Sequence, residues 1–149
     1  MKIEGFYKVP APREVVYKQL LDPQTLKQAL PGCEKLEPNP DGSYQAEIKV
    51  GIAAVKGTYQ GRVEIVDQNP PERFRIRVNA QGKGGFLKGE GEIFLTGSDG
   101  ETTVSYAGDT QVGGLIAAVG QRMIQAATRQ IVTQFFQAFA KQLQQGAAS

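Results

Sequence analysis

The apolar residues of this chain recur first with a period of two and then with a period of 3.6, and this change constrains the fold more than any other feature. Between Tyr44 and Val112, apolar and polar residues alternate along segments separated by turn signals such as Asn69-Pro70-Pro71 and Ser98-Asp99-Gly100. Alternation predicts strands with one buried and one wet face, which is typical of an antiparallel sheet. The glycines from Gly82 to Gly85 lie between two such strands, so they predict a hairpin and not a phosphate-binding loop.

After Gly113-Gly114 the pattern becomes helical and stays so to about Leu143. A helix from about Gly114 to Leu143 would be roughly 45 Å long at 1.5 Å rise per residue, enough to cross the sheet. Ahead of the sheet, a strand from Ile3 to Val9 precedes two short helices, the second with Asp22 as its N-cap and Pro23 in its first turn.

A sheet with one apolar face and a single long helix to cover it has few ways to pack. We therefore predict an α+β helix-grip fold, in which a curved antiparallel β-sheet surrounds a long C-terminal helix and two short helices follow the first strand. At 149 residues the chain fits one domain, residues 1–149.

The composition excludes most catalytic and metal chemistry. The chain has no histidine and one cysteine, Cys33, so a zinc site, a Ser-His-Asp triad and a Cys-His pair lack the residues they need. We predict no catalytic residue, no metal and no cofactor, and a structural role for Cys33. A net charge of +2, without a cluster of Lys and Arg among aromatic residues, argues against a nucleic-acid partner.

The sequence predicts neither secretion nor membrane insertion. The first residues, Met1-Lys2-Ile3-Glu4, alternate polar and apolar side chains, so we expect no signal peptide. No stretch approaches the ~18 uninterrupted apolar residues that a spanning helix needs. We expect a soluble cytoplasmic protein, with any membrane contact peripheral and at the inner face of the cell membrane.

Glycines and polar residues occupy positions that the alternation places on the inner face of the sheet. Inward glycines such as Gly89 and Gly91 either bend the sheet around the helix or leave room for another body, and both can hold at once. On one interpretation, the inward hydroxyls and amides bond one another or the tyrosine hydroxyls reach the mouth of the cavity; on a second, they bind the polar end of a mostly apolar ligand. On the second interpretation, the ligand-binding residues are Tyr44, Ile48, Tyr59, Phe74, Ile76, Val78, Leu87, Ile93, Tyr106, Thr110, Leu115, Gln121, Ile124 and Thr128.

The segment from Val112 to Gly120 is apolar on all sides, unlike the one-sided stripe that follows it. Burial under the two short helices is the simpler interpretation, and contact with a membrane or a partner protein is the alternative. No acidic residue follows Gly113, whereas Arg122, Arg129 and Lys141 are basic, which suits anionic lipid headgroups.

We place the mouth of the cavity where this apolar segment meets the Gly82-to-Leu87 hairpin. An apolar mouth would let a ligand leave a membrane without exposing its tail to water. Phe86, Ile116 and Arg122 are the residues we expect to contact a membrane or partner there.

Arg73, Arg75 and Arg77 form an outward row on one strand. We expect these arginines to pair with acidic residues on neighbouring strands, such as Glu64 or Glu47, because opposite charges across a sheet attract. A docking surface for an acidic partner is the alternative.

Several motifs resemble the CoxG family of carbon monoxide dehydrogenase G subunits, and together they cover essentially the whole chain. The most specific block runs from Asp22-Pro23 to Leu30-Pro31-Gly32-Cys33-Glu34. The others are Pro10-Ala11-Pro12-Arg13-Glu14-Val15, Val50-Gly51, Lys56-Gly57-Thr58-Tyr59-Gln60-Gly61, Gly120-Gln121-Arg122 and Phe135-Phe136. Two positions differ from the family pattern: Tyr17 stands where tryptophan is expected, and Ile52 where proline is expected.

This resemblance implies the Bet v 1/START-like (SRPBCC) superfamily, whose helix-grip fold surrounds an apolar cavity. It also implies a non-catalytic accessory protein that binds a quinone or lipid and recruits a molybdenum hydroxylase, such as carbon monoxide dehydrogenase, to the inner membrane face. Two alternatives stay open: a cyclase-, aromatase- or isomerase-like enzyme of the same superfamily, and a purely structural assembly factor. The enzyme would need an ionisable pair in the cavity, and the inward positions carry no Asp, Glu, Lys or Arg.

Overall fold

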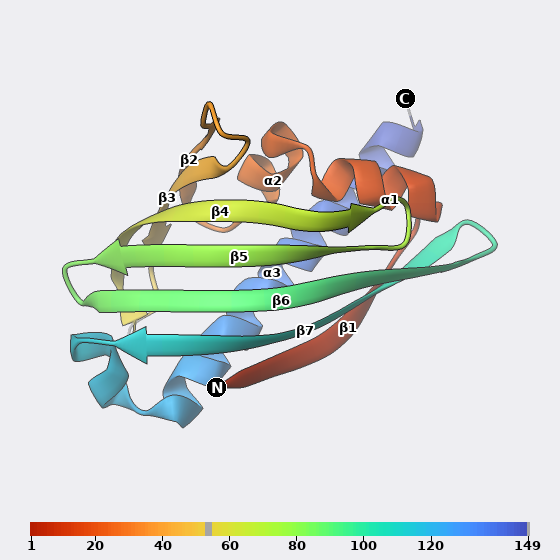
Figure 1. The fold of residues 1–149 in the computed structure, drawn as a ribbon. Coiled ribbons are helices and arrows are strands. Elements are labelled where there is room, and N and C mark those ends of the chain that lie inside the picture. The colour runs from red at the N-terminus through yellow and green to blue at the C-terminus, as the bar shows by residue number, and fades with distance from the viewer. Residues whose placement is uncertain (53–54, 149) are drawn as a thin grey trace.

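A computed structural model describes residues 1–52 and 55–148 and contains one seven-stranded antiparallel sheet. The strands lie side by side in the order β1-β7-β6-β5-β4-β3-β2 (Figure 1). Their bounds are β1 Lys2–Val9, β2 Cys33–Pro38, β3 Tyr44–Val50, β4 Gly57–Asn69, β5 Arg73–Gly82, β6 Gly85–Ser98 and β7 Glu101–Gly113.

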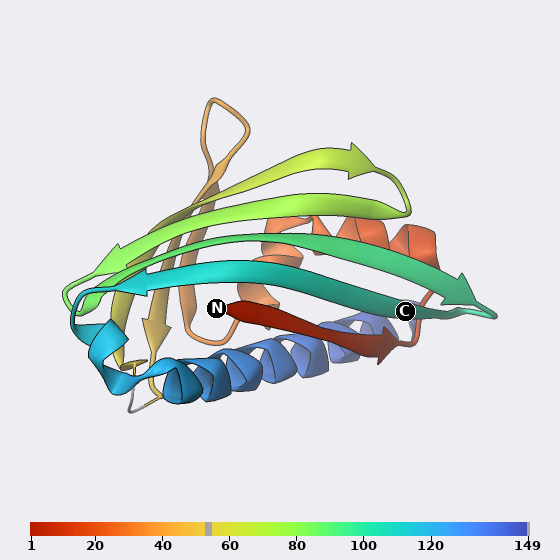
Figure 2. The same ribbon diagram turned by 60° about the horizontal axis from the view of Figure 1, so that its bottom comes forward.

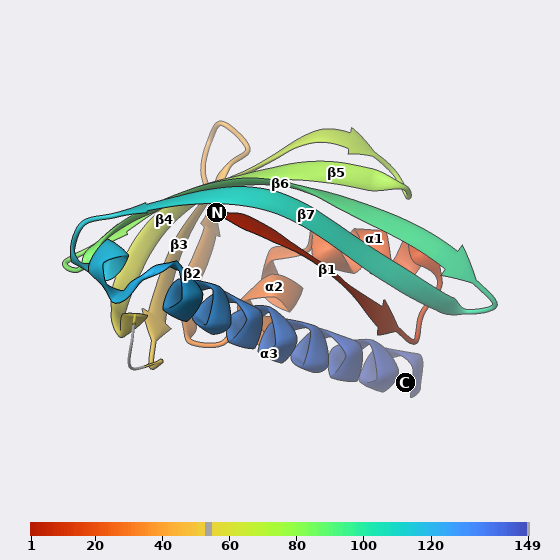
Figure 3. The ribbon, with the colours of Figure 1, turned by 90° about the horizontal axis from the view of Figure 1, so that it is seen from below.

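The helices cover the concave side of this sheet (Figures 2 and 3). They are α1 Arg13–Leu20, α2 Pro23–Ala29, the short 3₁₀ helix η2 Leu115–Val119 and α3 Gln121–Ala148. The long helix α3 runs across the concave face, with α1 and α2 near its C-terminal half and η2 at its start (Figure 3). The predicted helix-grip fold is therefore confirmed.

The local signals for the helices and turns hold in the structure. The Asp22 carboxylate accepts a hydrogen bond from the Gln24 backbone N–H at 2.9 Å, which is the predicted N-cap of α2. The β5–β6 hairpin closes with Gly82 opposite Gly85, and β6–β7 turns at Asp99-Gly100, where both residues have positive φ. Positive φ at both positions suits the twist of a two-residue hairpin.

Two predictions about where helices and strands lie were wrong. Strand β2 was missed because Cys33-Glu34-Lys35-Leu36-Glu37-Pro38 alternates only weakly; its pairing with β3, through a bulge near Cys33, makes it a strand. The predicted continuous helix from Gly114 is broken at Gly120, which has φ 95° and ψ 150°. The apolar turn η2 is thus separate from α3.

The inward glycines let neighbouring strands approach closely. Gly91 lies opposite Gly108, and a Cβ added at Gly108 would lie 2.9 Å from the carbonyl oxygen of Glu90. A Cβ at Gly91 would lie 3.2 Å from the carbonyl oxygen of Ala107. Side chains there would press on backbone, so these two glycines support the strong curvature of the sheet.

The core is concentrated at one end of the molecule, which we call the closed end. Side chains of β1, β6, β7, α1 and the C-terminal half of α3 are buried together there, among them Val9, Val16, Leu95, Val104 and Phe139. Aromatic rings add contacts: Tyr7 stacks on Phe136 with ring centroids 5.3 Å apart. The closed end therefore anchors α3 to the sheet.

Arg75 and Arg77 of the outward row pair with acidic residues of the neighbouring strand β6, as the expectation of cross-strand pairing requires, but the partners we had named, Glu64 and Glu47, were wrong. Arg75 lies 2.9 Å from Glu90 and 3.6 Å from Glu92, and Arg77 lies 3.7 Å from Glu90. These pairs are partly exposed, so each contributes little to stability. They do neutralise the middle of the outer face.

Replacing Gly120 with alanine should destabilise the protein by about 1–3 kcal/mol, because its backbone conformation is accessible essentially only to glycine. An added Cβ would meet no atom within 4 Å, so the cost comes from the backbone alone. Gly51→Ala is the control: its Cβ also enters open space, and its φ lies outside the strained range. Urea unfolding should therefore separate the two variants, and equal midpoints would contradict this account of the break.

Candidate functional site

The concave face at the end opposite the core, which we call the open end, carries apolar side chains that are only half-buried. Ile76, Val78 and Leu87 face α3 from β5 and β6, yet none is fully buried. On β3, β4 and β7 the inward Ile48, Tyr59 and Thr110 are likewise half-buried. The same strands thus have a packed half and a solvent-accessible half.

A pocket of about 450 Å³ opens at this end, between the end of β7, η2 and the start of α3. Its lining residues are Met1, Phe86, Thr110, Gln111, Val112, Ala117, Gln121 and Ile124. Ile124 is buried at the pocket wall, whereas Gln121 is exposed. This size falls in the range of small-molecule pockets.

Most of the inward hydroxyls already have backbone partners. Tyr59 donates to the carbonyl oxygen of Val55 at 2.7 Å, and Thr128 donates to that of Ile124 at 2.8 Å. Thr110 donates to the carbonyl oxygen of Met1 at 3.4 Å. The interpretation that these groups satisfy one another therefore needs correcting, because their partners are backbone carbonyls. Burial raises the pKa of the Tyr59 phenol, which keeps it protonated.

The structure brings most of the predicted ligand-binding residues to the concave face, but not to one place. Phe74 belongs to the closed end, where it is buried edge-on against Tyr17 with ring centroids 5.6 Å apart. Ile93 and Tyr106 pack partly against the same core. The residues nearer the open end are Tyr44, Ile48, Tyr59, Ile76, Val78, Leu87 and Thr110 on the strands, and Ile124 and Thr128 on α3 itself. Whether any of them contacts a ligand stays a prediction.

The apolar segment at the open end is exposed, which overturns its predicted burial under the short helices. No residue of η2 is buried, and Leu115 is 77% exposed, so it points away from the cavity in which we had placed it. Met123 and Phe86 are 50% and 43% exposed. The short helices lie instead with the other end of α3 (Figure 3).

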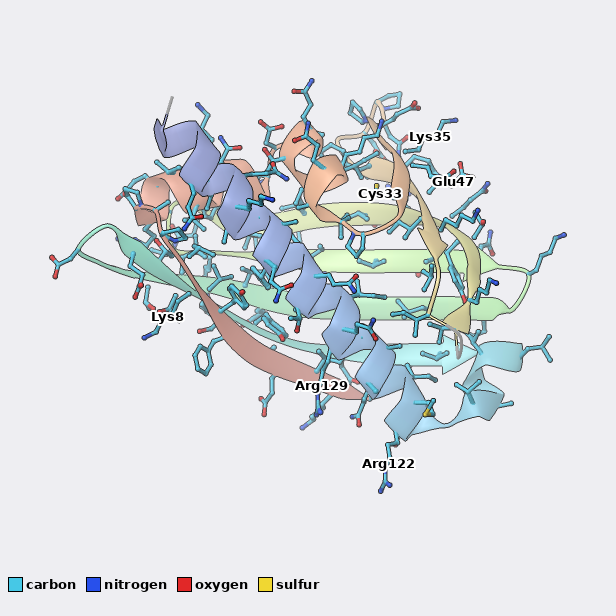
Figure 4. All side chains as sticks on the ribbon, turned by 180° about the vertical axis from the view of Figure 1, so that it is seen from behind. Lys8, Cys33, Lys35, Glu47, Arg122 and Arg129 are labelled. Carbon is cyan, nitrogen blue, oxygen red and sulfur yellow. The ribbon has the colours of Figure 1, made fainter. Side chains whose placement is uncertain are left out.

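The predicted rim residues lie together at this end. The Ile116 backbone N–H donates to the carbonyl oxygen of Gly84 at 2.8 Å, so η2 is tied to the β5–β6 hairpin. Ile116 itself is half-buried against that hairpin, and Leu115 is the more exposed side chain. Arg122 projects outward from the first turn of α3 (Figure 4).

Sequence reasoning missed a second hollow of about 480 Å³ on the outer face of the sheet. It is lined by Gln45, Gln60, Gly61, Arg62, Asn79, Ala80, Gln81, Phe86, Leu87 and Lys88. The alternation of apolar and polar residues shows only that most of these side chains face water. It does not show a hollow in the outer face, because a hollow depends on how the sheet twists. The hollow could have been found from the cross-strand register of β4 and β5. This register places Arg62 opposite Asn79 and Gln60 opposite Gln81.

The described residues contain no cluster of three or more metal-binding side chains. In the same ranges, no helix is long and apolar enough to cross a membrane. Cys33 donates its thiol to the carbonyl oxygen of Lys35 at 3.3 Å, and burial raises the pKa of that thiol. A raised pKa disfavours the reactive thiolate and agrees with a structural role.

An open antiparallel sheet that grips a C-terminal helix, with a packed end and an accessible end, defines the START-like helix-grip class. Within this class, the family model of the carbon monoxide dehydrogenase G subunit (CoxG) matches residues 5–144, so the chain belongs to that family. The resemblance found in the motifs is thereby confirmed. No curated protein sequence matches the chain significantly.

Solved structures support the same class. A conserved protein from Geobacillus kaustophilus is 34% identical, with a TM-score of 0.94 over 97% of this chain and 96% of that one. A START superfamily protein from Mycobacterium smegmatis has a TM-score of 0.74 at 13% identity, covering 97% of each chain. The Zhui aromatase/cyclase from Streptomyces sp. R1128 has a TM-score of 0.71 at 16% identity, over 95% of this chain and 92% of that one. The last two show the fold alone.

The two ends should respond differently to the same mutation. Val104→Ala at the closed end, where the side chain is 0% exposed, should cost about 2–3 kcal/mol, from lost burial of two carbons and the cavity left behind. Val78→Ala at the open end should cost under about 1 kcal/mol, because that side chain is half-buried already. Both residues lie in inner strands of the sheet, so the loss of strand propensity from valine to alanine is the same in the two variants. Equal losses in urea unfolding would mean that the open end is packed.

Proposed function

We propose that this protein is a non-catalytic carrier that holds an apolar ligand, a quinone or a lipid, between its sheet and α3. As a CoxG-family accessory protein it recruits a molybdenum hydroxylase, such as carbon monoxide dehydrogenase, to the inner face of the cell membrane. The ligand enters at the open end, where the pocket and the exposed apolar side chains lie together.

One observation carries the choice of binding over catalysis. Every inward position in the paired stretches of β3 to β7 is apolar, glycine, threonine or tyrosine, with no Asp, Glu, Lys or Arg among them. An apolar ligand needs such a wall with few polar groups, whereas acid–base catalysis needs a titratable pair.

The Tyr59 phenol, an ionisable group on this face, is a poor catalyst. The phenol of Tyr59 donates to a backbone carbonyl, and its raised pKa disfavours the phenolate that a general base would need. This argues against a cyclase-like enzyme. A purely structural assembly factor would need no accessible apolar wall, so the half-buried side chains of the open end favour a carrier.

The rim of the open end supports a role at a membrane. Leu115, Met123 and Phe86 expose apolar side chains at the end of the molecule that carries Arg122, and no acidic residue follows Gly113 in the sequence. Exposed apolar groups beside cations suit anionic lipid surfaces.

Leucine at Gly89 should block ligand binding while the fold survives. Gly89 faces inward on β6, and an added Cβ would meet the Thr110 methyl group at 3.2 Å, a side chain that can adjust. Leucine would then project into the accessible space. Titration with a long-chain quinone should show saturable binding by the parent, weakened about tenfold or more in Gly89→Leu.

The control for this experiment is Lys88→Leu, which adds leucine at the neighbouring position on the outer face. It should bind like the parent. If the parent shows no saturable binding of quinone or lipid, the carrier function is wrong. If Gly89→Leu binds like the parent, the ligand lies elsewhere.

Membrane contact through the rim predicts that Leu115→Asp combined with Arg122→Glu weakens binding to phosphatidylglycerol vesicles. Losing one exposed leucine that would insert into the lipid surface, together with one cation, should lower the affinity about tenfold or more. The matched control is Phe6→Asp with Lys8→Glu, which makes the same charge change on β1, where Phe6 is 67% exposed. Co-sedimentation measures both. Equal losses in the two double variants would mean that net charge, and not the rim, governs vesicle binding.

A further inference from the structure

The hollow of about 480 Å³ on the outer face of the sheet lies beside the rim of the open end. It extends over β3 to β6, and its outward side chains form two neighbouring cross-strand rows. One row is Gln45, Arg62, Asn79 and Lys88, and the other is Gln60, Gln81 and Phe86. The Phe86 ring lies over Gly113, where an added Cβ would collide with it, and is 43% exposed. Because Phe86 also belongs to the rim, the hollow is continuous with the exposed apolar surface there.

Four amide side chains give the hollow its hydrogen-bonding groups. All four are exposed, and within residues 1–52 and 55–148 the hydrogen bonds that amide side chains make use other residues. They are Gln45, Gln60, Asn79 and Gln81. Each amide is neutral and has both a donor NH₂ group and an acceptor oxygen. A hydroxyl also donates and accepts, so a ligand with neighbouring hydroxyls matches this set.

The charges of the hollow favour an anion on its β6 side. The Arg62 Nε donates to the Ser43 hydroxyl at 3.1 Å, and its guanidinium pairs with the Asp41 carboxylate, so its charge is compensated. Lys88 is exposed and forms no ion pair in the part of the chain that the structure describes. No lining residue is acidic, and Glu47 borders the hollow only on the β3 side. An anionic group therefore fits beside Lys88.

The hollow lies at the depth of lipid headgroups if the rim contacts a membrane. The β5–β6 hairpin and η2 lie together at the open end (Figure 1). Phe86 and Lys88 are one and three residues from Gly85, where β6 begins. At about 3.3 Å per residue, Lys88 is roughly 10 Å from the hairpin along the strand. Apolar faces of peripheral helices insert roughly 5–10 Å into the headgroup and acyl boundary, so the hollow would open among the headgroups.

We propose that this outer hollow binds the head of a phospholipid that carries both a phosphate and neighbouring hydroxyls, as phosphatidylglycerol does. Lys88 faces the phosphate, the amides of Gln60 and Gln81 bond the hydroxyls, and the carbons of the head lie against the Phe86 ring. Lys88 points away from the inner face of the sheet, so it takes no part in holding a quinone there. This inference rests on the proposed membrane contact and adds the headgroup that the protein selects.

Two anionic lipids separate the hydroxyls from the charge. Phosphatidylglycerol and phosphatidylethanol carry the same single negative charge, and only the first has hydroxyls. Co-sedimentation of the full chain uses phosphatidylcholine vesicles that contain an equal fraction of one or the other. The parent should bind the phosphatidylglycerol vesicles about threefold to tenfold more tightly, which is the usual range for one or two hydrogen bonds.

Gln60→Leu combined with Gln81→Leu removes two of the amides from exposed positions, so the fold should survive, and an unchanged melting temperature checks this. The ratio of the two affinities should fall to less than about half of the parent value. Added leucine strengthens contact with both lipids alike, so the ratio is the readout. Gln68→Leu is the control, because it removes an exposed amide from the other end of the same strand β4, and it should keep the parent ratio.

The outcomes separate this inference from the proposed membrane contact. If the parent binds both lipids equally, the headgroup subsite is wrong although the membrane contact stands. If the folded double variant keeps the parent ratio, or if Gln68→Leu lowers it equally, the hollow is not the subsite. If the parent binds neither vesicle, the membrane contact fails as well.

A soluble competitor separates a lipid head from a free polyol phosphate. Glycerol 3-phosphate has the same phosphate and neighbouring hydroxyls but no tail to accompany the rim into the membrane. At micromolar concentrations it should leave the protein on the phosphatidylglycerol vesicles, because a few exposed hydrogen bonds do not offset the entropy lost on binding. Displacement at those concentrations would mean that the hollow serves a free metabolite, and the lipid assignment would be wrong.

Discussion

The packing of α3 against one half of the sheet is the constraint on which the rest of the structure depends. Phe136 stacks on Tyr7 and Phe139 is fully buried, so the C-terminal half of the helix is fixed to β1 and its neighbours. The other half starts after the break at Gly120 and faces strands whose inward side chains are half-buried. The packed closed end thus fixes the position of α3 relative to the sheet, and the open end keeps apolar walls with accessible surface. In the proposed carrier function, the open end would supply the apolar walls and the accessible space that a ligand needs.

The fold follows from patterns that the sequence displays directly. Alternation from Tyr44 to Val112 and the helical stripe ending near Leu143 depend on burial, which acts at every position, so they predicted the sheet and its central helix. The Asp22 N-cap and the Asp99-Gly100 turn are local, and they too were predictable. For the candidate site, the sequence predicted which face of the sheet it occupies but not which residues of that face are accessible. Ile76 and Val78 face α3 as expected, whereas Phe74 on the same strand belongs to the core.

What the sequence could not reveal depends on tertiary pairing. The apolar run of η2 is compatible with a helix, and only its contact with the β5–β6 hairpin and the glycine break separate it from α3. Strand β2 exists because β3 offers it a partner. The outward arginines could pair with acidic residues on several strands. Because β6 lies beside β5 in the sheet, Arg75 pairs with Glu90.

The most direct test of the account is to ask what the folded protein carries. Native mass spectrometry of the full chain, purified without detergent, should show a second species heavier by the mass of one small apolar molecule. Solvent extraction of the same sample should release a neutral quinone or lipid in near-stoichiometric amount, and the extracted protein should take it up again. A single species at the mass of the bare chain, which stays unchanged after incubation with membrane lipids and quinones, would contradict the account.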